Sequence, residues 1–366
     1  MTRPKAGSLF LRARTGAPTH SVGGAPRPGS GQAPPGAERR PTEDELVAQL
    51  LAITAQAAPE KLVVGIGDDA AVWQPSRSAR SVVTTDALIE GVHFTCEAMS
   101  ARDVGHRALA SNLSDVAAMG ARPVLATIAF GIGPRADEAW ILDCYRGMAA
   151  LAERAGCAIA GGDLVRAPAI ALAIAVIGEV RPSNCKTRAG MRPGDVIAVT
   201  GPLGASRAGL EVAGRPDLAG HADAAAALRA FRTPEPRLAE GRWLGASRNV
   251  HAMMDLSDGL STDLGRLARA SEVGATITSV PIAPAAAGIA AAAGGDAEAW
   301  ALGGGEDFEL LVAVAPRAFR HLAGRFRAQF GRELLAVGSA TAEAGLRRAD
   351  GAPVAAGGWD HLAGRG

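Results

Sequence analysis

The sequence predicts a two-domain protein of the α/β class. A chain of 366 residues that is 48% hydrophobic and 20% charged can bury a large core and is long enough for two domains. Short apolar runs typical of β-strands alternate with longer stretches whose apolar residues have helical spacing. Acidic residues follow several of these apolar runs, often beside glycine or serine, and this pattern indicates a functional site at the ends of strands.

The N-terminal 41 residues are predicted to be a disordered extension. They are rich in Pro, Gly, Arg and Ser, carry no acid before Glu38 and show no periodic apolar pattern. Their Arg-rich composition resembles a transit peptide, but we favour a variable extension or a true start further downstream. Order is expected to begin at Thr42, because Thr42 and Glu45 have the spacing of a capping box at the start of a helix.

Residues 42–182 are predicted to form the first domain. After the helix that starts at Thr42, the expected elements are strands at 63–66 and 82–85, helices at 103–119 and 138–155, and strands at 157–160 and 170–180. The polar segment 182–192 then marks a change of composition, and we place the domain boundary near residue 182.

The second domain, residues 183–366, is also expected to be α/β. A strand at 194–200 turns on Gly201 and Pro202 into a helix at about 203–214. The later elements are expected to be a helix at 259–270, an Ala-rich helical stretch at 284–301, and strands at 308–314 and 334–337. These strands lie too far apart in sequence to be joined by hairpins alone.

Charge, hydropathy and cysteine usage argue against several classes of protein. A net charge of +1 and a single Tyr give no basic footprint or stacking series for nucleic acid. No apolar run approaches the roughly 18 residues of a membrane span. The four cysteines form no CxxC pair, so neither a zinc site nor a disulfide framework is indicated, and a reducing cytoplasm fits. Lys186-Thr187 follows Cys185 rather than glycine, so a P-loop is not expected.

Clusters of oxygen ligands suggest a site for several metal ions and a polyphosphate. Mg²⁺ prefers oxygen ligands and is usually held by one or two carboxylates together with substrate phosphates. Taken singly, each aspartate is better explained as a helix cap or turn residue, but five clusters in one chain weaken that explanation and favour the metal site. The candidate carboxylates are Asp69, Asp86, Asp115, Asp163, Asp255 and Asp258, with the hydroxyls of Thr84 and Thr85 beside Asp86.

The setting of each cluster gives a local expectation. Thr84-Thr85-Asp86 is expected to end a strand, and Gly161-Gly162-Asp163 to form a loop whose amides contact phosphate. Asp115 lies beside an apolar helical stripe, where a carboxylate usually has a cation or a basic partner. Ser257 or Asp258 is a competent N-cap for the following helix. The three glycines at 303–305 imply close backbone approach, either by a ligand or by a neighbouring chain segment.

Taken in order, eight motifs resemble the thiamine-monophosphate kinase family. They are GIGDDAAV (65–72), TTDALIEGVHF (84–94), SNLSDVAAMGA (111–121), GGD (161–163), TRAGMRPGD (187–195), TGPLG (200–204), MDLSDGLSTDLG (254–265) and GGGEDFELL (303–311). The match covers about residues 42–366. It implies the two-domain fold of the aminoimidazole ribonucleotide synthetase superfamily, with a ferredoxin-like N-terminal domain that binds ATP and metal and forms a homodimer, and an α/β C-terminal domain that completes the site.

The resemblance also implies a reaction and a set of site residues. The expected reaction is direct in-line transfer of the ATP γ-phosphoryl group to thiamine monophosphate, the last step of thiamine diphosphate synthesis, with several Mg²⁺ ions and no catalytic base. By matching motifs, the ATP contacts are Gly162, Asp163, Arg188 and Ser257, and the thiamine-phosphate contacts are His93, Glu306 and Trp359. The metal shell is Asp69, Thr84, Thr85, Asp86, Asp115, Asp163, Asp255 and Asp258.

Other members of the superfamily remain as alternatives. Selenophosphate synthetase carries a reactive Cys or selenocysteine in its N-terminal glycine-rich segment, and the hydrogenase maturation factor ends in Cys; this chain has neither. The purine enzyme should lack the match at 303–310. A non-catalytic ATP-binding scaffold is a different class of protein, and the intact acidic set argues against it.

Overall fold

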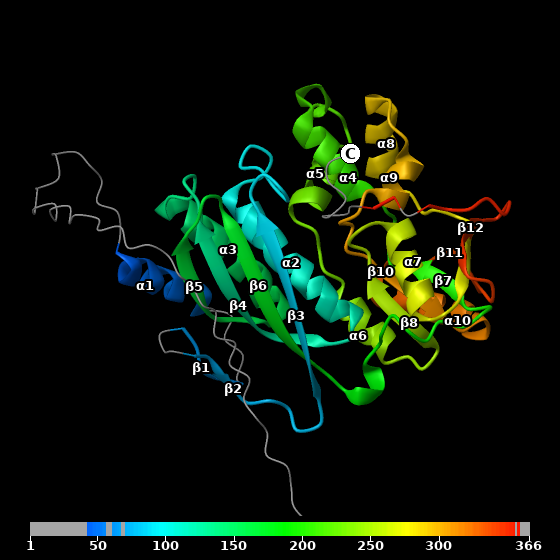
Figure 1. Ribbon diagram of the computed structural model, residues 1–366, viewed down its shortest axis with the longest axis horizontal. Helices are drawn as coiled ribbons and strands as arrows, with labels where there is room; N and C mark the ends of the chain where they lie inside the picture. Colours follow the sequence, from blue (N-terminus) through cyan, green and yellow to red (C-terminus); the bar gives the residue numbers. More distant parts are fainter. Residues whose placement is uncertain (1–41, 56–60, 67–69, 356, 359–366) are drawn as a thin grey trace, which may run out of the picture. The chain divides into compact units, whose positions relative to one another are not determined.

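The computed structural model describes residues 42–55, 61–66, 70–355 and 357–358. These residues form a four-stranded sheet from the first half of the chain and a six-stranded sheet from the second half, together with a small two-stranded ribbon (Figure 1). The two-domain α/β class is therefore confirmed. The predictions for residues 1–41, for Asp69 and for Trp359 lie outside the described residues.

The first described helix starts at the predicted capping box. α1 (Glu43–Thr54) has Thr42 as its N-cap, with the Thr42 side chain accepting from the Glu45 N–H and the Glu45 carboxylate accepting from the Thr42 N–H. Two unpaired backbone donors at the helix end are thereby satisfied. Leu46 and Leu50 are buried and join the first hydrophobic core.

The N-terminal sheet has the strand order β3-β6-β4-β5. Its strands are β3 (Arg80–Ile89), β4 (Arg122–Ile132), β5 (Ala158–Arg166) and β6 (Ala171–Val180), of which only β4 and β5 pair in parallel. The elements follow one another as β-α-β-α-β-β, which differs from the β-α-β-β-α-β connectivity of the ferredoxin-like expectation.

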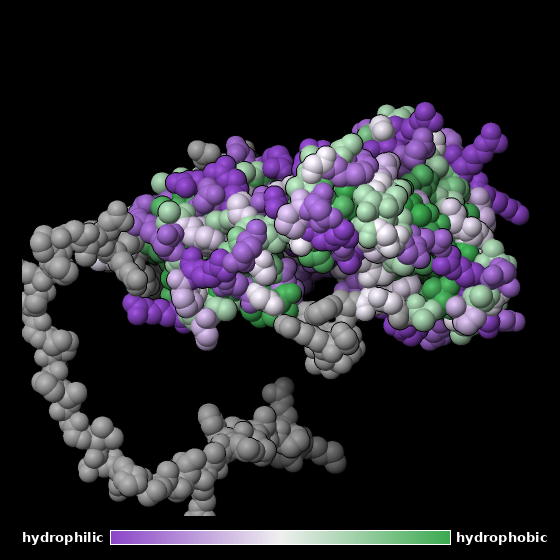
Figure 2. All heavy atoms as spheres, turned by 90° about the horizontal axis from the view of Figure 1, so that it is seen from above, coloured by the Kyte–Doolittle hydropathy of each residue, from purple (hydrophilic) through white to green (hydrophobic). Residues whose placement is uncertain are grey.

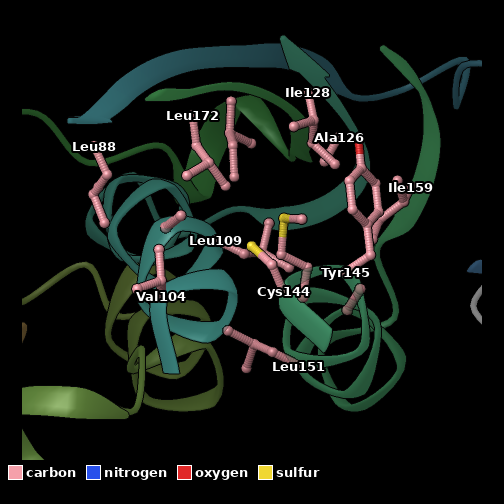
Figure 3. Packing of buried hydrophobic residues seen from close by; sticks show 14 of the residues in the cluster. Leu88, Val104, Leu109, Ala126, Ile128, Cys144, Tyr145, Leu151, Ile159 and Leu172 are labelled. Carbon is pink, nitrogen blue, oxygen red and sulfur yellow. The ribbon is translucent and has the colours of Figure 1, made fainter. Parts of the chain in front are cut away.

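Two helices cover one face of this sheet. α2 (Ala101–Ala118) and α3 (Glu138–Ala155) pack against it, and Figure 3 shows side chains of the strands and of both helices meeting in one core. Successive side chains of a strand point to opposite faces, so Thr84, Asp86 and Leu88 of β3 face α2. Val83, Thr85, Ala87 and Ile89 lie on the opposite face, where they are exposed.

Within the described residues, that opposite face is covered at one end. β1 (Leu62–Val64) and β2 (Val72–Trp73) form the two-stranded ribbon, and Leu62 and Trp73 pack on a small buried cluster of β4 and β5 residues. Large hydrophobic side chains elsewhere on β3 and β5 stay exposed, among them Val83 at 68% and Val165 at 48%. We call this surface the open face of the N-terminal sheet.

The C-terminal sheet has the order β12-β9-β11-β7-β10-β8 and is antiparallel except for β12 and β9. Its strands are β7 (Val196–Val199), β8 (Val250–Asp255), β9 (Gly274–Ile277), β10 (Leu310–Val314), β11 (Leu335–Thr341) and β12 (Gly345–Arg348). α7 (Leu260–Ala270) contributes to the core on one face, whereas α6 (Leu238–Gly245) and α10 (Pro316–Phe330) contribute to the core on the other.

The remaining helices form a separate layer, and one of the helices expected from the sequence is in fact two. α4 (Ala205–Gly214), α5 (Ala224–Arg232), α8 (Pro284–Ala293) and α9 (Ala297–Gly303) share a small core. The helical stretch expected at 284–301 is thus two helices, because Gly294 ends α8 in the left-handed conformation with φ of 72°. Short 3₁₀ turns lie at Pro182–Asn184 and Pro216–Leu218.

The surface shows scattered hydrophobic patches, and the cysteines are unpaired. On the face of the molecule in Figure 2, hydrophobic residues form separate patches between hydrophilic ones. Within the described residues, no helix combines the length and the apolar character needed to cross a bilayer. All four cysteines are free thiols, and Cys144 and Cys157 are buried.

Candidate functional site

One stripe of α2 faces the candidate site. Ser111 lies four residues after Arg107, and Ser114 and Asp115 lie three and four residues after Ser111, so these four residues share one side of α2. Each contacts a residue from another element, as the next paragraphs describe. α2 therefore acts as the scaffold to which the site residues from both halves of the chain are tied.

The contacts of Asp115 and Ser111 hold Thr84 and Asp86 of β3. Thr84 donates its hydroxyl hydrogen bond to the Asp115 carboxylate. The Asp86 N–H donates to Oδ1 of Asn112 at 3.1 Å, and its carboxylate accepts a hydrogen bond from Ser111. Burial raises the pKa of Asp86, and the neighbouring Asp115 charge raises it further. Thr84, Asp86 and Asp115 thus form one group of oxygen donors at the interface of β3 and α2.

Asp255 joins this group from the C-terminal sheet. It is the last residue of β8, it is 3% exposed, and it accepts a hydrogen bond of 2.8 Å from the Ser114 hydroxyl. Burial raises the pKa of Asp255 to about 7, with repulsion from Asp115 adding to the effect and the Arg188 charge opposing it. Arg188 also opposes the raised pKa of Asp115, which places its guanidinium near both carboxylates.

The loop after β8 is held by two residues that sequence reasoning did not select. Asp263 accepts from the N–H groups of Ser257 and Asp258 at 3.0 and 2.9 Å, and Arg266 pairs with both Asp258 and Asp263. The N-cap prediction for Ser257 or Asp258 is wrong, because the N-cap of α7 is Gly259 and no side chain caps it. Asp263, from the first turn of α7, performs the equivalent role by folding the loop back onto the helix.

Thr85, Gly162 and Asp163 are not brought to this group within one chain. β3 continues to Ile89 and β5 to Arg166, so neither Thr85-Asp86 nor Gly161-Gly162 ends a strand as expected. Thr85 lies on the open face, opposite to Thr84. A Cβ on Gly162 would meet the Ile128 carbonyl oxygen at 2.0 Å, so this glycine admits the neighbouring strand.

The register across the sheet shows how far Asp163 lies from β3. Asp86 is opposite Ile174, Ile174 is opposite Ile128, and Ile128 is opposite Gly162. Three strand spacings of about 4.8 Å therefore separate Asp86 from Gly162, a distance of roughly 14 Å along a flat sheet. Asp163 follows on the edge strand β5, and its side chain is on the open face.

Glu306 lies where the two halves of the chain meet. Its carboxylate forms an ion pair with Arg107 of α2, and its N–H donates to the Ser257 carbonyl at 2.8 Å. Of the two alternatives for the glycines at 303–305, the structure favours a neighbouring chain segment. A Cβ on Gly305 would lie 2.7 Å from the Ser257 carbonyl oxygen, and one on Gly303 would lie 2.8 Å from that of Gly357.

His93 occupies the turn that follows β3. The ring Nδ1 of His93 accepts a hydrogen bond of 3.1 Å from the Ile89 N–H, and the backbone N–H of His93 donates to the Ile89 carbonyl at 2.9 Å. The turn therefore fixes the ring relative to the strand that carries Asp86. Because one ring nitrogen accepts, the neutral ring has its proton on Nε2.

The donor set fits a hard divalent cation without forming a complete metal site. In the described part of the chain, no three Asp, Glu, His or Cys side chains converge closely enough to hold a metal. The oxygen donors that do gather around α2 are the type that Mg²⁺ prefers, and Mg²⁺ normally takes its remaining ligands from water and phosphate. Thr84, Asp86, Asp115, Asp255 and Asp258 are the described residues that could hold it.

Sequence reasoning missed the residues that support this group. Ser111 and Ser114 precede Asp115 within a motif already singled out, but only the helical spacing from Asp115 could have placed them on the same side. Asp263 lies within the same acidic motif as Asp255 and Asp258, five residues beyond the latter. Arg107 carries no sequence signal of its role, since its partner is 199 positions away.

Two family models match the chain. They are the N-terminal domain of AIR synthase related protein over residues 67–180 and the C-terminal domain of AIR synthase related protein over residues 192–350. A thiamine-monophosphate kinase of Synechococcus elongatus is 37% identical over 263 residues, which cover 68% of this chain and 77% of that protein.

Solved structures give the same result. The crystal structure of thiamine-monophosphate kinase from Stenotrophomonas maltophilia superposes with a TM-score of 0.76 at 35% identity, covering 84% of this chain and 96% of that one. The structure of AaThiL complexed with AMPPCP and TMP superposes with a TM-score of 0.70 at 27% identity, covering 87% of this chain and 97% of that one.

Proposed function

The chain belongs to the thiamine-monophosphate kinase family, and from this premise we propose that it phosphorylates thiamine monophosphate to thiamine diphosphate with ATP. One observation carries the proposal beyond the family match. Carboxylates from β3, α2 and β8 meet along a single stripe of α2, at the residues that the family motifs select. A similar protein of this fold has been solved with AMPPCP and TMP together, which supports the same pair of ligands here.

The proposed reaction joins two anions. An oxygen of the thiamine monophosphate phosphate attacks the γ-phosphorus of ATP, the bond from that phosphorus to the bridging oxygen breaks, and ADP leaves. Mg²⁺ bound among the carboxylates supplies neutralisation of the phosphate charges. The chain needs no general base, because the attacking phosphate is already ionised near neutral pH.

The described residues divide the remaining tasks. Arg188 is exposed and close to Asp115 and Asp255, so its guanidinium suits a phosphate held beside the metal. Ser257 lies in the loop fastened by Asp263 and serves ATP. Glu306, which is partly exposed, pairs with the cationic thiamine, and His93 faces the substrate phosphate. Trp359, outside the described residues, is proposed as the stacking partner of the thiamine ring.

We further propose a homodimer in which Asp163 and Gly162 serve the partner's site. β3 and β5 are the two edges of the N-terminal sheet, and the open face between them exposes Val83, Ile89 and Val165. If β3 of one copy lies beside β5 of another, both exposed edges are paired and the partner's Asp163 comes to the same open face as Thr85, the residue before Asp86. A cytoplasmic location is also part of the proposal, and the four free thiols support it.

The test is a direct assay of the purified protein. Thiamine monophosphate is incubated with ATP and Mg²⁺, the thiamine species are separated by chromatography, and Asp86→Ala is compared with Asp143→Ala, a partly exposed aspartate of α3. We expect thiamine diphosphate from the unmutated protein and from Asp143→Ala, and a rate at least about 100-fold lower from Asp86→Ala.

Two negative results have different meanings. Absence of product with intact ATP binding would point to another acceptor within the superfamily. Absence of ATP binding as well would favour the scaffold alternative.

A further inference from the structure

Arg107 is a buried charge that the proposed chemistry does not use. It lies in the middle of α2, its side chain is 2% exposed, and it is among the largest fully buried side chains of the described residues. A buried guanidinium is costly unless it is paired and hydrogen-bonded. The contacts of Arg107 therefore indicate which part of the structure depends on it.

Three contacts hold the guanidinium in one orientation. Nη1 donates to the Phe231 carbonyl of α5, and the Phe231 ring lies 4.8 Å from the guanidinium carbon. Nη2 forms the ion pair with Oε2 of Glu306, the one carboxylate within ion-pair distance of Arg107 among the described residues. The first two contacts fix the guanidinium, so that the third fixes Glu306.

Glu306 is held in a conformation that needs such support. Its φ of 56° is in the left-handed region, as is that of Phe308 at 48°, and non-glycine residues rarely adopt it. Backbone hydrogen bonds from Glu306 and Phe308 to Ser257 and Leu256 fasten the loop to the acidic segment after β8. These hydrogen bonds fix the backbone of the loop, and the ion pair with Arg107 fixes the Glu306 side chain.

The two oxygens of Glu306 have different surroundings. Oε2 pairs with Arg107, whereas Oε1 has no partner within the described residues, and the side chain is 39% exposed. A carboxylate held through one oxygen presents its second oxygen to a ligand in a defined direction. The entropy cost of ordering the Glu306 side chain on ligand binding is therefore lower. A buried ion pair adds little net stability, so its main physical effect here is orientation.

We propose that Arg107 is a positioning residue for the acceptor substrate: it holds Glu306 so that the free carboxylate oxygen meets the cationic part of thiamine monophosphate. This inference rests on the proposed function. Along the same side of α2, Asp115 lies eight residues further, or about 12 Å by helical rise. One helix would thus set the distance between the cation contact and the metal-binding carboxylates.

The experiment compares Arg107→Met, Arg107→Lys, Glu306→Gln and the double variant Arg107→Met/Glu306→Gln. The matched control is Arg102→Met. Arg102 is on α2, like Arg107, and this change removes an exposed ion pair with Asp143 of α3. KM for thiamine monophosphate, KM for ATP, kcat and the unfolding midpoint are measured for each. We expect Arg107→Met to raise KM for thiamine monophosphate about 10- to 100-fold, with KM for ATP changed less than about twofold.

The other variants separate positioning from folding. Arg107→Lys keeps a charge but loses the guanidinium fork that contacts both Phe231 and Glu306, so it should raise KM for thiamine monophosphate selectively, though less than Arg107→Met does. The double variant should be no worse than Glu306→Gln alone, because Arg107 acts through Glu306. Arg102→Met should leave all kinetic values unchanged. If Arg107→Met does not fold, Arg107→Lys decides: a selective rise in KM for thiamine monophosphate supports the inference.

Three results would overturn it. Unchanged kinetics in the Arg107 variants would show that Glu306 is positioned without them. Equal changes in both KM values would show a structural role alone. If the unmutated protein makes no thiamine diphosphate, the proposed function fails first and the inference falls with it, an outcome distinct from an active enzyme that is insensitive to Arg107.

Discussion

At the scale of single residues, Glu179 shows how donors can outweigh the cost of burial. Its carboxylate accepts from the N–H and hydroxyl of Ser76 at 2.8 and 2.6 Å, and pairs with Lys61 and Arg122. Burial alone would raise its pKa, but the Ser76 hydrogen bonds and the Arg122 charge lower it to about 2. The ionised Glu179 carboxylate therefore contributes about 2–3 kcal/mol to the free energy of unfolding, after allowing for the partly exposed partners.

The sign of this shift predicts how stability depends on pH. A lowered pKa gives stability that is present above the unfolded value of 4.5 and is lost as pH falls towards 2. Glu179→Gln should thus cost about 2–3 kcal/mol at pH 7 and less than about half of that at pH 3. Urea unfolding at both pH values checks this, with exposed Glu343→Gln as control. A penalty of equal size at pH 3 and pH 7 would contradict it.

The candidate site could be predicted from sequence as a set of residues but not as a geometry. Motif spacing selected Asp86, Asp115 and Asp255, and the structure brings them together. It could not show that Thr85 faces away from Thr84, because the face of a strand residue depends on where the strand starts and what packs on it. Arg107 could not be selected either, since its role comes from a contact between two distant segments.

At the scale of elements, prediction succeeded where the ends of an element are marked and failed where they are not. α3 was predicted to the residue, with Asp137 capping its start and Gly156 its end. β4 was missed, although it is an inner strand of its sheet, because its buried residues give a continuous apolar run without alternation. The division of the chain near residue 182 stays a prediction.

The crossing of α2 and α3 depends on two glycines, and this gives a prediction at the same scale. A Cβ on Gly105 would lie 1.9 Å from the Cys144 carbonyl oxygen, and one on Gly147 would lie 2.0 Å from that of Arg102. Gly147→Ala should push the helices apart and cost about 2 kcal/mol or more. Gly324 in α10 has open space around it, so Gly324→Ala should instead stabilise by about 0.5–1 kcal/mol.

Thermal unfolding of the two variants decides between these effects. Both changes add the same methyl group to a helix, so helix propensity alone would shift both midpoints upward. A lower midpoint for Gly147→Ala beside a higher one for Gly324→Ala would assign the difference to the helix crossing. Similar shifts in both would show that α2 and α3 can separate without loss. Because α2 carries the stripe of residues that contacts the candidate site, Gly147→Ala should also lower activity.

At the scale of the whole molecule, the placement of Asp163 predicts that each active site needs two chains. Asp86 faces α2 near one edge of the N-terminal sheet, whereas Asp163 lies on the open face of the opposite edge strand. A single chain cannot bring the two carboxylates to one metal without rearranging the sheet. In a dimer with β3 beside the partner's β5, the partner's Asp163 would lie on the same open face as Thr85, one residue from Asp86, so each site would use β3 of one chain and Asp163 of the other.

Mixing two inactive variants tests this arrangement. Asp86→Ala and Asp163→Ala should each be inactive alone, but random re-association makes half of the dimers mixed, and each mixed dimer has one intact site and one with both defects. Activity should therefore recover to roughly a quarter of the unmutated value. Light scattering checks that the variants remain dimers. If both carboxylates served the same chain's site, every site in the mixture would lack one of them, and no activity would return at any ratio.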